Sequence, residues 1–232
     1  MTGERVSEPG TAFASIATGR SIREWVVRLL LLFAGLTIAH LGITLFILSH
    51  LGSDPFTTLA QGLARAVNVS IGTMFVILFF VLMFAMLFFT KGYVKPGTAV
   101  CAFCGGPIID AFSWLLEGIV NAGASMPVRI AAMLMGTVIL AIGMALVIKS
   151  DAGTGPNDLV AMILTDRLRR FQFRWMRIAC DAVFTAAGFL LGGVVGFGTL
   201  AAVLLVGPVA QVFFPLYDGI VPVVVRKFVP RK

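Results

Sequence analysis

Residues 28–49 read RLLLLFAGLTIAHLGITLFILS, and residues 129–150 read RIAAMLMGTVILAIGMALVIKS. Each stretch is an almost uncharged apolar run that begins at an arginine. A helix needs roughly 17–25 such residues to cross the ~30 Å hydrocarbon core of a bilayer. The two runs lie 101 residues apart (28 to 129), and at this offset glycine falls on glycine twice and the closing serines coincide. These paired runs predict a membrane protein with an internal repeat.

Composition extends this prediction to the whole chain. Of the 232 residues, 59% are hydrophobic and 12% are charged, whereas soluble domains carry about 25% charged residues. A chain of this size lacks the interior to bury such an excess, which excludes a soluble enzyme, a disordered chain and a fibrous repeat. The net charge of +7 comes from Lys and Arg that cluster at the ends of the apolar runs. That placement is typical of membrane topology, so no nucleic-acid partner is expected.

Six apolar stretches are long enough to cross the bilayer. We expect these crossings at residues 25–49, 71–90, 98–121, 128–149, 175–195 and 199–217. The connecting segments alternate between rich and poor in Lys and Arg, which predicts a bacterial inner-membrane protein with both termini in the cytoplasm. Residues 1–24 are expected to form a disordered N-terminal tail, and residues 218–232 a basic C-terminal tail.

The repeat continues beyond the two apolar runs. The same offset places Gly52 on Gly153, Pro55 on Pro156, Gly97-Thr98 on Gly198-Thr199, Gly106-Pro107 on Gly207-Pro208 and Phe112 on Phe213. It divides the chain into residues 25–121 and 122–217, with three crossings in each half. An odd number of crossings gives the halves opposite orientations, as in many secondary transporters, whose sites lie near the midplane. The expected fold class is an all-α polytopic membrane protein with six transmembrane helices in two inverted three-helix repeats.

A string rich in glycine and proline follows the first helix of each half. Residues 153–158 read GTGPND, and residues 52–57 read GSDPFT. Glycine and proline end the long helix, and proline then begins a short one. We therefore expect short helices at residues 55–67 and 156–168 that lie at the interface or re-enter the membrane. The hinge candidates in these strings are Gly52, Pro55, Gly153, Gly155 and Pro156.

The first turns of these short helices carry candidate binding residues. The N-terminus of a re-entrant helix presents free backbone N–H groups and the positive end of the helix dipole, which suits an anion. Asp54, Asn157 and Asp158 lie at these positions and are assigned as candidate contacts to a solute or ion. The alternative interpretation of Asp158 is a capping carboxylate at an ordinary turn.

Asp110 is the strongest candidate for a central site. It lies about twelve residues into its helix, or ~18 Å of rise, near the bilayer centre, where a carboxylate costs at least ~2.5–3.5 kcal/mol. Gln211 occupies the equivalent position of the second half, so the pair could line one site with Asp110 as a proton carrier. The alternative is a polar contact between packed helices. Prolines kink membrane helices, and the hinge candidates here are Gly106, Pro107, Gly207 and Pro208.

The remaining polar residues allow simpler interpretations. His40 could relay protons or bind a ligand, or it could be a satisfied core histidine. Arg177 and Asp181 are explained as an ion pair one helical turn apart, and Cys101 and Cys104 as small packing residues. The sequence carries no nucleophilic triad, phosphate-binding loop or haem motif. We expect no catalytic residues, no cofactor and no metal site, and thus not an enzyme.

At residues 153–158 the chain resembles the YczE/YyaS/YitT family of bacterial multi-pass membrane proteins. Gly97-Thr98 and residues 106–110, which read GPIID, carry the same resemblance, and it covers about residues 28–215. The first-half string departs from the family pattern, since Asp54 precedes the proline and Thr57 stands where the acid would fall. The resemblance implies a shared membrane fold more than an activity.

Two functions fit these features. The first is a small-solute transporter or permease that works by alternating access, in which Asp110 and Gln211 contact solute or proton and the Gly-Pro strings act as gates. The second is a non-transporting accessory protein that assembles or regulates a partner complex. A homo-oligomer or a partner membrane protein is compatible with either function. A polar cavity around Asp110 would favour transport, and a dry, filled interior would favour the accessory role.

Overall fold

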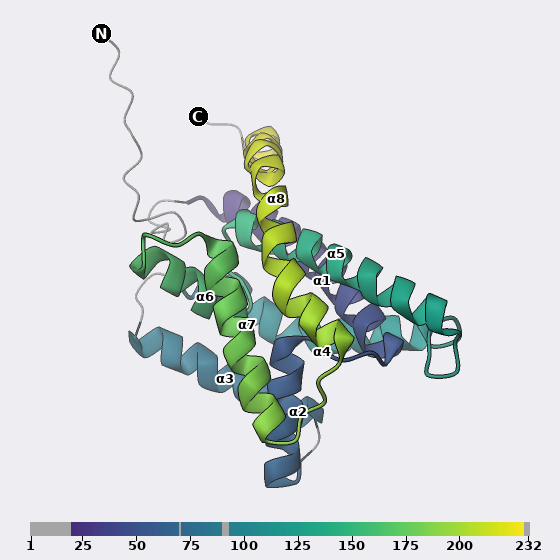
Figure 1. Cartoon of the computed structure of the whole chain (residues 1–232). Helices are drawn as coiled ribbons and strands as arrows, with labels where there is room; N and C mark the ends of the chain where they lie inside the picture. The colour runs from purple at the N-terminus through teal and green to yellow at the C-terminus, as the bar shows by residue number, and fades with distance from the viewer. Residues whose placement is uncertain (1–19, 70, 90–92, 230–232) are drawn as a thin grey trace.

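The described residues of the chain fold into eight helices without a strand among them (Figure 1). The structure is a computed structural model, and it describes residues 20–69, 71–89 and 93–229. The helices are α1 (Ile22–Ser49), α2 (Pro55–Val67), α3 (Ile71–Phe89), α4 (Pro96–Leu116), α5 (Met126–Ser150), α6 (Pro156–Arg167), α7 (Phe173–Leu190) and α8 (Phe197–Phe228). The all-helical prediction is confirmed, and so are the two short helices that begin at the Gly-Pro strings.

Helices α1 and α5 form an antiparallel pair at the centre of the molecule. The start of α1 reaches the end of α5, where Arg28 Nη1 donates to the Ser150 carbonyl at 2.9 Å. At the other end of the pair, Arg129 Nε donates to the Ser49 carbonyl at 2.7 Å. The two contacts are equivalent in the repeat, because Arg28 and Arg129 lie 101 residues apart and so do Ser49 and Ser150. The two arginines that open the apolar runs thus cap the free carbonyls at the end of the partner helix.

Glycines let the backbones of α1 and α5 approach closely. A Cβ atom on Gly143 would lie 2.6 Å from the Gly35 carbonyl oxygen, and one on Gly42 would lie 2.6 Å from the Gly136 carbonyl oxygen. Both distances are far below van der Waals contact, so a larger residue at Gly42 or Gly143 would push the helices apart. Membrane helices commonly use small residues in this way.

The segments that follow α1 and α5 have matching conformations. His50 and Asp151 end the two helices with φ angles of 51° and 57°, and Gly52 and Gly153 follow with φ angles of 134° and 141°. Only glycine adopts such a φ readily, which explains its occurrence at both positions. We refer to residues 50–54 as the α1–α2 loop and to residues 151–155 as the α5–α6 loop.

Each of these loops is held by the start of a further long helix. Gly97 N, in the first turn of α4, donates to the Ala152 carbonyl at 2.8 Å, and Gly198 N, in the first turn of α8, donates to the Leu51 carbonyl at 2.8 Å. Helix α4 packs along α1, and α8 packs along α5. The short helices α2 and α6 both pack against α7, and α3 contacts α2, α4 and α6.

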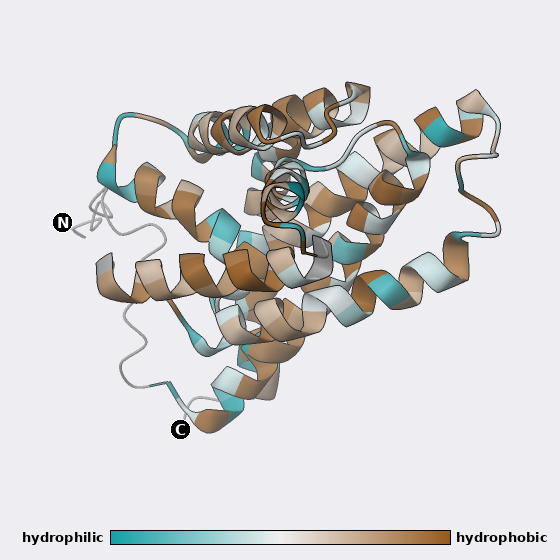
Figure 2. Ribbon diagram, turned by 90° about the horizontal axis from the view of Figure 1, so that it is seen from below, coloured by the Kyte–Doolittle hydropathy of each residue, from teal (hydrophilic) through white to brown (hydrophobic). Residues whose placement is uncertain are grey.

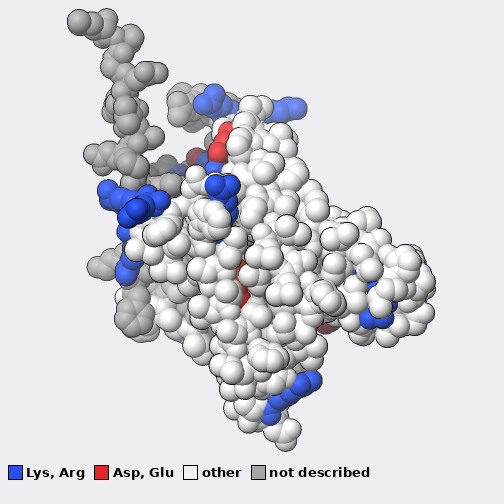
Figure 3. All heavy atoms as spheres, viewed as in Figure 1, with Lys and Arg blue, Asp and Glu red and all other residues white. Residues whose placement is uncertain are grey.

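The surface of the folded chain is that of a membrane protein. Four helices, α1, α4, α5 and α8, are long and apolar enough to cross a bilayer, and hydrophobic residues make up most of each (Figure 2). Large apolar side chains face outward, and Trp114 and Phe88 are each 84% exposed. Most of the blue Lys and Arg atoms lie toward the edges of the face in Figure 3, and the surface between them is largely free of charged atoms. Helices α3 and α7 are shorter, so the expectation of six crossings stays a prediction.

The last helix is longer than the sequence suggested. We expected a crossing to end near Tyr217 and a tail to follow, but α8 continues through Pro222 to Phe228. Val221 and Val225 are buried in a cluster with Leu146 of α5, which extends the helix along its neighbours. The described part of the expected tail is therefore helical, while residues 230–232 and the N-terminal residues 1–19 lie outside the described part of the chain.

Candidate solute-binding site

A cavity of about 70 Å³ lies where the first turns of α2 and α6 meet the central helices. All eight helices contribute to its wall, which is mostly apolar. We call this space the central cavity, and its polar lining consists of His40, Asp54, Asn157, Asp158, Arg177 and Asp181. A mostly apolar wall with a few converging polar groups is the usual character of a ligand site.

Asp54 caps the N-terminus of α2. Its carboxylate accepts a hydrogen bond from the Thr57 backbone N–H at 3.2 Å and a second one from the Thr57 hydroxyl. Aspartate is favoured here because it satisfies a free backbone N–H and because its negative charge faces the positive end of the helix dipole. Asp54 therefore has a structural role in addition to lining the cavity.

Asp158 lies in the first turn of α6 and connects this helix to α7. Its Oδ1 atom accepts hydrogen bonds from Asn157 Nδ2 at 3.1 Å and from the Arg177 guanidinium. Arg177 also donates from Nε to Asp181 Oδ2 at 2.7 Å. One guanidinium thus bridges two carboxylates, and we call Asp158, Arg177 and Asp181 the ionic bridge. Its side chains are 13%, 8% and 2% exposed, and buried charges of this kind persist only when they are paired.

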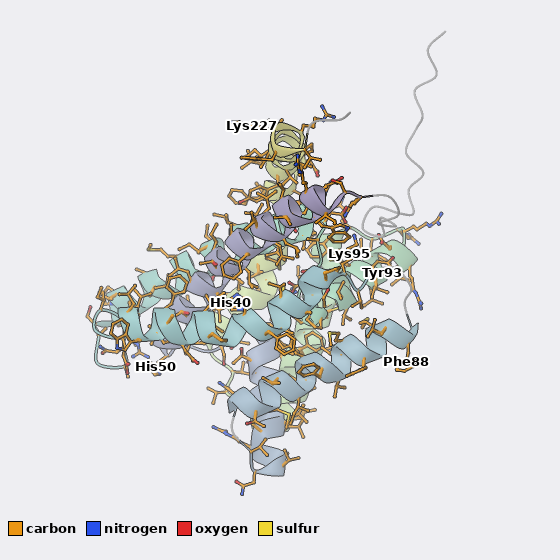
Figure 4. The ribbon with its side chains drawn as sticks, turned by 180° about the vertical axis from the view of Figure 1, so that it is seen from behind. His40, His50, Phe88, Tyr93, Lys95 and Lys227 are labelled. Carbon is orange, nitrogen blue, oxygen red and sulfur yellow. The ribbon has the colours of Figure 1, made fainter. Side chains whose placement is uncertain are left out.

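His40 contributes a different kind of group to the cavity. It lies in the middle of α1 near α4 (Figure 4), and its Nδ1 atom is 2.8 Å from the Leu36 carbonyl oxygen. Because a carbonyl can only accept, Nδ1 carries the proton, and Nε2 of the neutral ring is an acceptor. Nε2 has no hydrogen-bond partner among the described residues. A Cβ atom on Gly105 of α4 would lie 2.6 Å from Nε2, so glycine there makes room for the ring.

Negative charge predominates in the central cavity. Three carboxylates face it, from Asp54, Asp158 and Asp181, against the single guanidinium of Arg177. The N-termini of α2 and α6 each supply roughly +0.5 of an elementary charge, which reduces the negative excess without cancelling it. The electrostatic environment therefore favours a cation over an anion, in contrast to the anion that a bare helix N-terminus would suit.

Two larger cavities flank the central one. The first, of about 240 Å³, is lined by Gly153 and Thr154 of the α5–α6 loop together with charged residues that include Arg28, Lys95 and Asp151. The second, of about 320 Å³, is lined by His50, Gly52 and Ser53 of the α1–α2 loop. The next residues of each loop line the central cavity, namely Gly155 and Asp54. Each loop therefore contributes consecutive residues to the central cavity and to one larger cavity.

The structure brings together four of the six predicted binding residues. His40, Asp54, Asn157 and Asp158 line the same cavity, although they are distributed over both halves of the chain. The hydrogen bond that Asp158 accepts from Arg177 of α7 shows that its part in the fold exceeds that of an ordinary cap. Two of the predicted hinges, Gly52 and Gly153, have the positive φ that such a role allows.

Asp110 and Gln211 do not face each other across a central site. Helix α4 buries Gly97, Cys101 and Gly105, and Asp110 is exposed because five residues after Gly105 amount to ~140° of rotation. Gln211 Oε1 accepts from Arg174 N at 3.2 Å, at the start of α7. Neither residue lines the central cavity. The cavity that gathers polar groups lies around Asp158 and not around Asp110, where the sequence placed it.

The hinge candidates near these two residues are also in different environments. Gly106 and Pro107 lie on the exposed face of α4, and a Cβ atom on Gly106 would meet nothing within 4 Å. Gly207 is buried in α8, where its Cβ would lie 3.2 Å from Arg177 Cβ. Gly207 thus makes room for the aliphatic part of the Arg177 side chain. Gly106 has no neighbouring side chain that would need such room.

Sequence reasoning assigned no functional part to Arg177 and Asp181. Their ion pair was predicted and is confirmed, but the contact from Arg177 to α6 was not. The signal was available, because two opposite charges inside an apolar helix indicate a functional position in a membrane protein. Among the described residues, no group of three His, Cys, Asp or Glu side chains is arranged to hold a metal ion.

Comparison with known proteins identifies relatives over most of the chain. YczE, an uncharacterized membrane protein of Bacillus subtilis, is 25% identical over 194 residues, which cover 83% of this chain and 88% of YczE. YyaS of the same organism is 26% identical over 184 residues, covering 79% and 90% of the two chains. An uncharacterized protein of Haemophilus influenzae is 30% identical over 205 residues, covering 88% and 90%.

No solved structure matches the chain significantly. The sequence matches a family of unknown function, DUF6198, over residues 26–215. This range includes the α1–α2 loop, the α5–α6 loop and the whole ionic bridge. The resemblance to YczE and YyaS inferred from the glycine and proline motifs is confirmed by these matches. The protein is a multi-pass membrane protein of the DUF6198 family.

Proposed function

We propose that this protein is a small-solute transporter of the bacterial inner membrane, with six crossings, two inverted halves and both termini in the cytoplasm. In this proposal it is not an enzyme, and the central cavity is the solute site near the midplane. The observation that carries the proposal is the placement of the three cavities. The charged central cavity shares one Gly-Pro loop with each of two larger cavities, because consecutive residues of each loop line both spaces.

Contacts that recur at an offset of 101 residues support the inverted halves. Arg28 binds the Ser150 carbonyl as Arg129 binds that of Ser49. The bond from the start of α4 to the α5–α6 loop has its counterpart in the bond from α8 to the α1–α2 loop. Each contact joins a residue of the first half to a residue of the second half. In each equivalent contact the two halves have exchanged roles, as an approximate two-fold axis requires. Inverted repeats of this kind are common in secondary transporters.

The two loops would act as gates because each closes one side of the cavity. The α5–α6 loop leads into Asp158, which the ionic bridge ties to α7. The α1–α2 loop is held by a hydrogen bond from Ser53 N to Thr199 Oγ1 at 3.2 Å. A solute enters when one gate opens while the other stays closed. Gly52 and Gly153 supply the backbone freedom for such movement.

Accessibility of the gates to a thiol reagent tests this proposal without a known substrate. The native cysteines Cys101, Cys104 and Cys180 are replaced by alanine, and a single cysteine is placed at Ser53 or Thr154. The protein is reconstituted in liposomes and labelled with a membrane-impermeant maleimide from one side or the other. Asp158→Asn removes the charge that holds the α5–α6 gate and leaves Arg177 paired with Asp181.

Alternating access predicts reciprocal changes in labelling. In the Asp158→Asn background, the cysteine at Thr154 should react faster and the cysteine at Ser53 more slowly, each from its own side of the membrane. Glu117→Gln, which removes an equal charge from an exposed site outside the cavities, should change neither rate. A faster reaction at Thr154 with no change at Ser53 would contradict alternating access and would favour a non-transporting accessory protein.

A further inference from the structure

We propose that the central cavity binds a small primary ammonium ion, whose N–H groups donate to Asp54, Asp158 and His40 Nε2. Its short alkyl part would contact the apolar wall of the cavity. The inference deepens the proposed function, since it assigns a chemical class to the transported solute. Binding itself requires only the cavity, so it is testable apart from transport.

The first argument is the charge and the hydrogen-bonding capacity of the carboxylates. Oδ1 of Asp158 is used by Arg177 and Asn157, while Oδ2 has one weak contact, to Thr154 Oγ1 at 3.5 Å. The Asp54 carboxylate has about four acceptor sites, and two of them accept hydrogen bonds from Thr57. Unused acceptors on negative groups suit a cation that donates hydrogen bonds.

The second argument is independent of the carboxylates and comes from His40. The side chain is 8% exposed, yet its Nε2 acceptor has no partner among the described residues. An unused acceptor on a mostly buried ring gains a hydrogen bond from a donor that enters the cavity. An anion offers no N–H group to this atom, whereas an ammonium ion offers three. The histidine thus indicates the same ligand chemistry as the carboxylates do.

The size and the wall of the cavity set an upper limit on the ligand. A volume of about 70 Å³ exceeds the ~10–15 Å³ that a cavity needs to hold one water molecule, and it suits a ligand of only a few non-hydrogen atoms. It accommodates an ammonium group with one or two carbon atoms. Apolar side chains line the remainder of the space, among them Leu36, Ile43, Phe56, Phe79, Leu140 and Met144. A short alkyl chain can contact this wall, and a fully hydrated inorganic cation cannot.

Isothermal titration of the full chain in detergent with ethylammonium chloride tests the proposal. Asp54→Asn keeps an oxygen that can accept from Thr57 N–H, and His40→Leu removes the free acceptor at similar volume. Each variant should lower the affinity for ethylammonium at least about tenfold, the effect of losing a hydrogen bond to a charged ligand. Glu117→Gln should bind as the native protein does. Elution as a single symmetric peak verifies that each variant is folded.

Three further ligands test whether the site requires an N–H donor and a positive charge. Tetramethylammonium has the positive charge but no N–H donor. Sodium chloride supplies an inorganic cation, and sodium acetate supplies an anion. None of the three should compete with ethylammonium. Absence of ethylammonium binding, an affinity in both variants equal to that of the native protein, or binding of tetramethylammonium as tight as that of ethylammonium would overturn the inference. Ethylammonium binding without reciprocal gate labelling would leave the site standing and reject transport. Reciprocal labelling without ethylammonium binding would reject the ligand class alone.

Discussion

The ionic bridge gives the most decisive prediction about stability. Arg177→Met keeps an extended apolar stem but removes the guanidinium, which leaves Asp158 and Asp181 buried without their shared cation. The three side chains are at most 13% exposed, so solvent screens them little. Removing one partner of a buried charge pair costs about 3–5 kcal/mol, or roughly a 10²- to 10⁴-fold change in the unfolding equilibrium.

The same reasoning predicts a rescue. The triple variant Arg177→Met, Asp158→Asn and Asp181→Asn removes all three charges, and neutral groups of similar shape are often as stable as the buried ions they replace. It should therefore be more stable than Arg177→Met alone, although it contains two more substitutions. Asp158→Asn alone leaves Arg177 with Asp181 and should cost only about 1–3 kcal/mol.

Reversible unfolding in mixed micelles with increasing denaturing detergent measures these differences. Near-ultraviolet absorbance or fluorescence of the tryptophans reports the transition, and each variant is compared with the native chain at equal micelle composition. A loss below about 1 kcal/mol for Arg177→Met, or a triple variant as unstable as the single one, would refute the assignment of the bridge as a buried ionic contact.

Other predictions concern topology, packing and the site. Reporter tags inserted near residues 60 and 160 should be found on opposite sides of the membrane, as inverted halves require, and tags on the same side would reject the repeat. Gly143→Ala should cost about 1–3 kcal/mol because its new Cβ would lie 2.6 Å from a carbonyl oxygen of α1; Gly106→Ala, at an open helical site, should instead be neutral or gain up to ~1 kcal/mol in the same unfolding assay. Asp110→Asn should leave ethylammonium binding unchanged in calorimetry, and a loss of binding would restore the site first inferred from the sequence.

Much of the architecture could be predicted from local properties of the chain. The apolar runs and the scarce charges imply a membrane protein, because a chain this small has no other place for such side chains. Gly-Pro strings end one helix and begin the next for reasons of backbone geometry that neighbours do not alter. The glycines of each apolar run lie seven residues apart, a spacing that places them on one helical face.

The composition of the central cavity was decided by the tertiary structure. Asp110 and Asp158 are both acids in apolar surroundings, but the rotation of α4 directs one outward and the contact with α7 buries the other. Arg177 has an evident partner one turn away in Asp181, while its second partner lies 19 residues away on another helix. Sequence spacing determines which residues share a helical face. Which face meets a neighbour depends on how all the helices pack together, because burial is a property of the whole assembly.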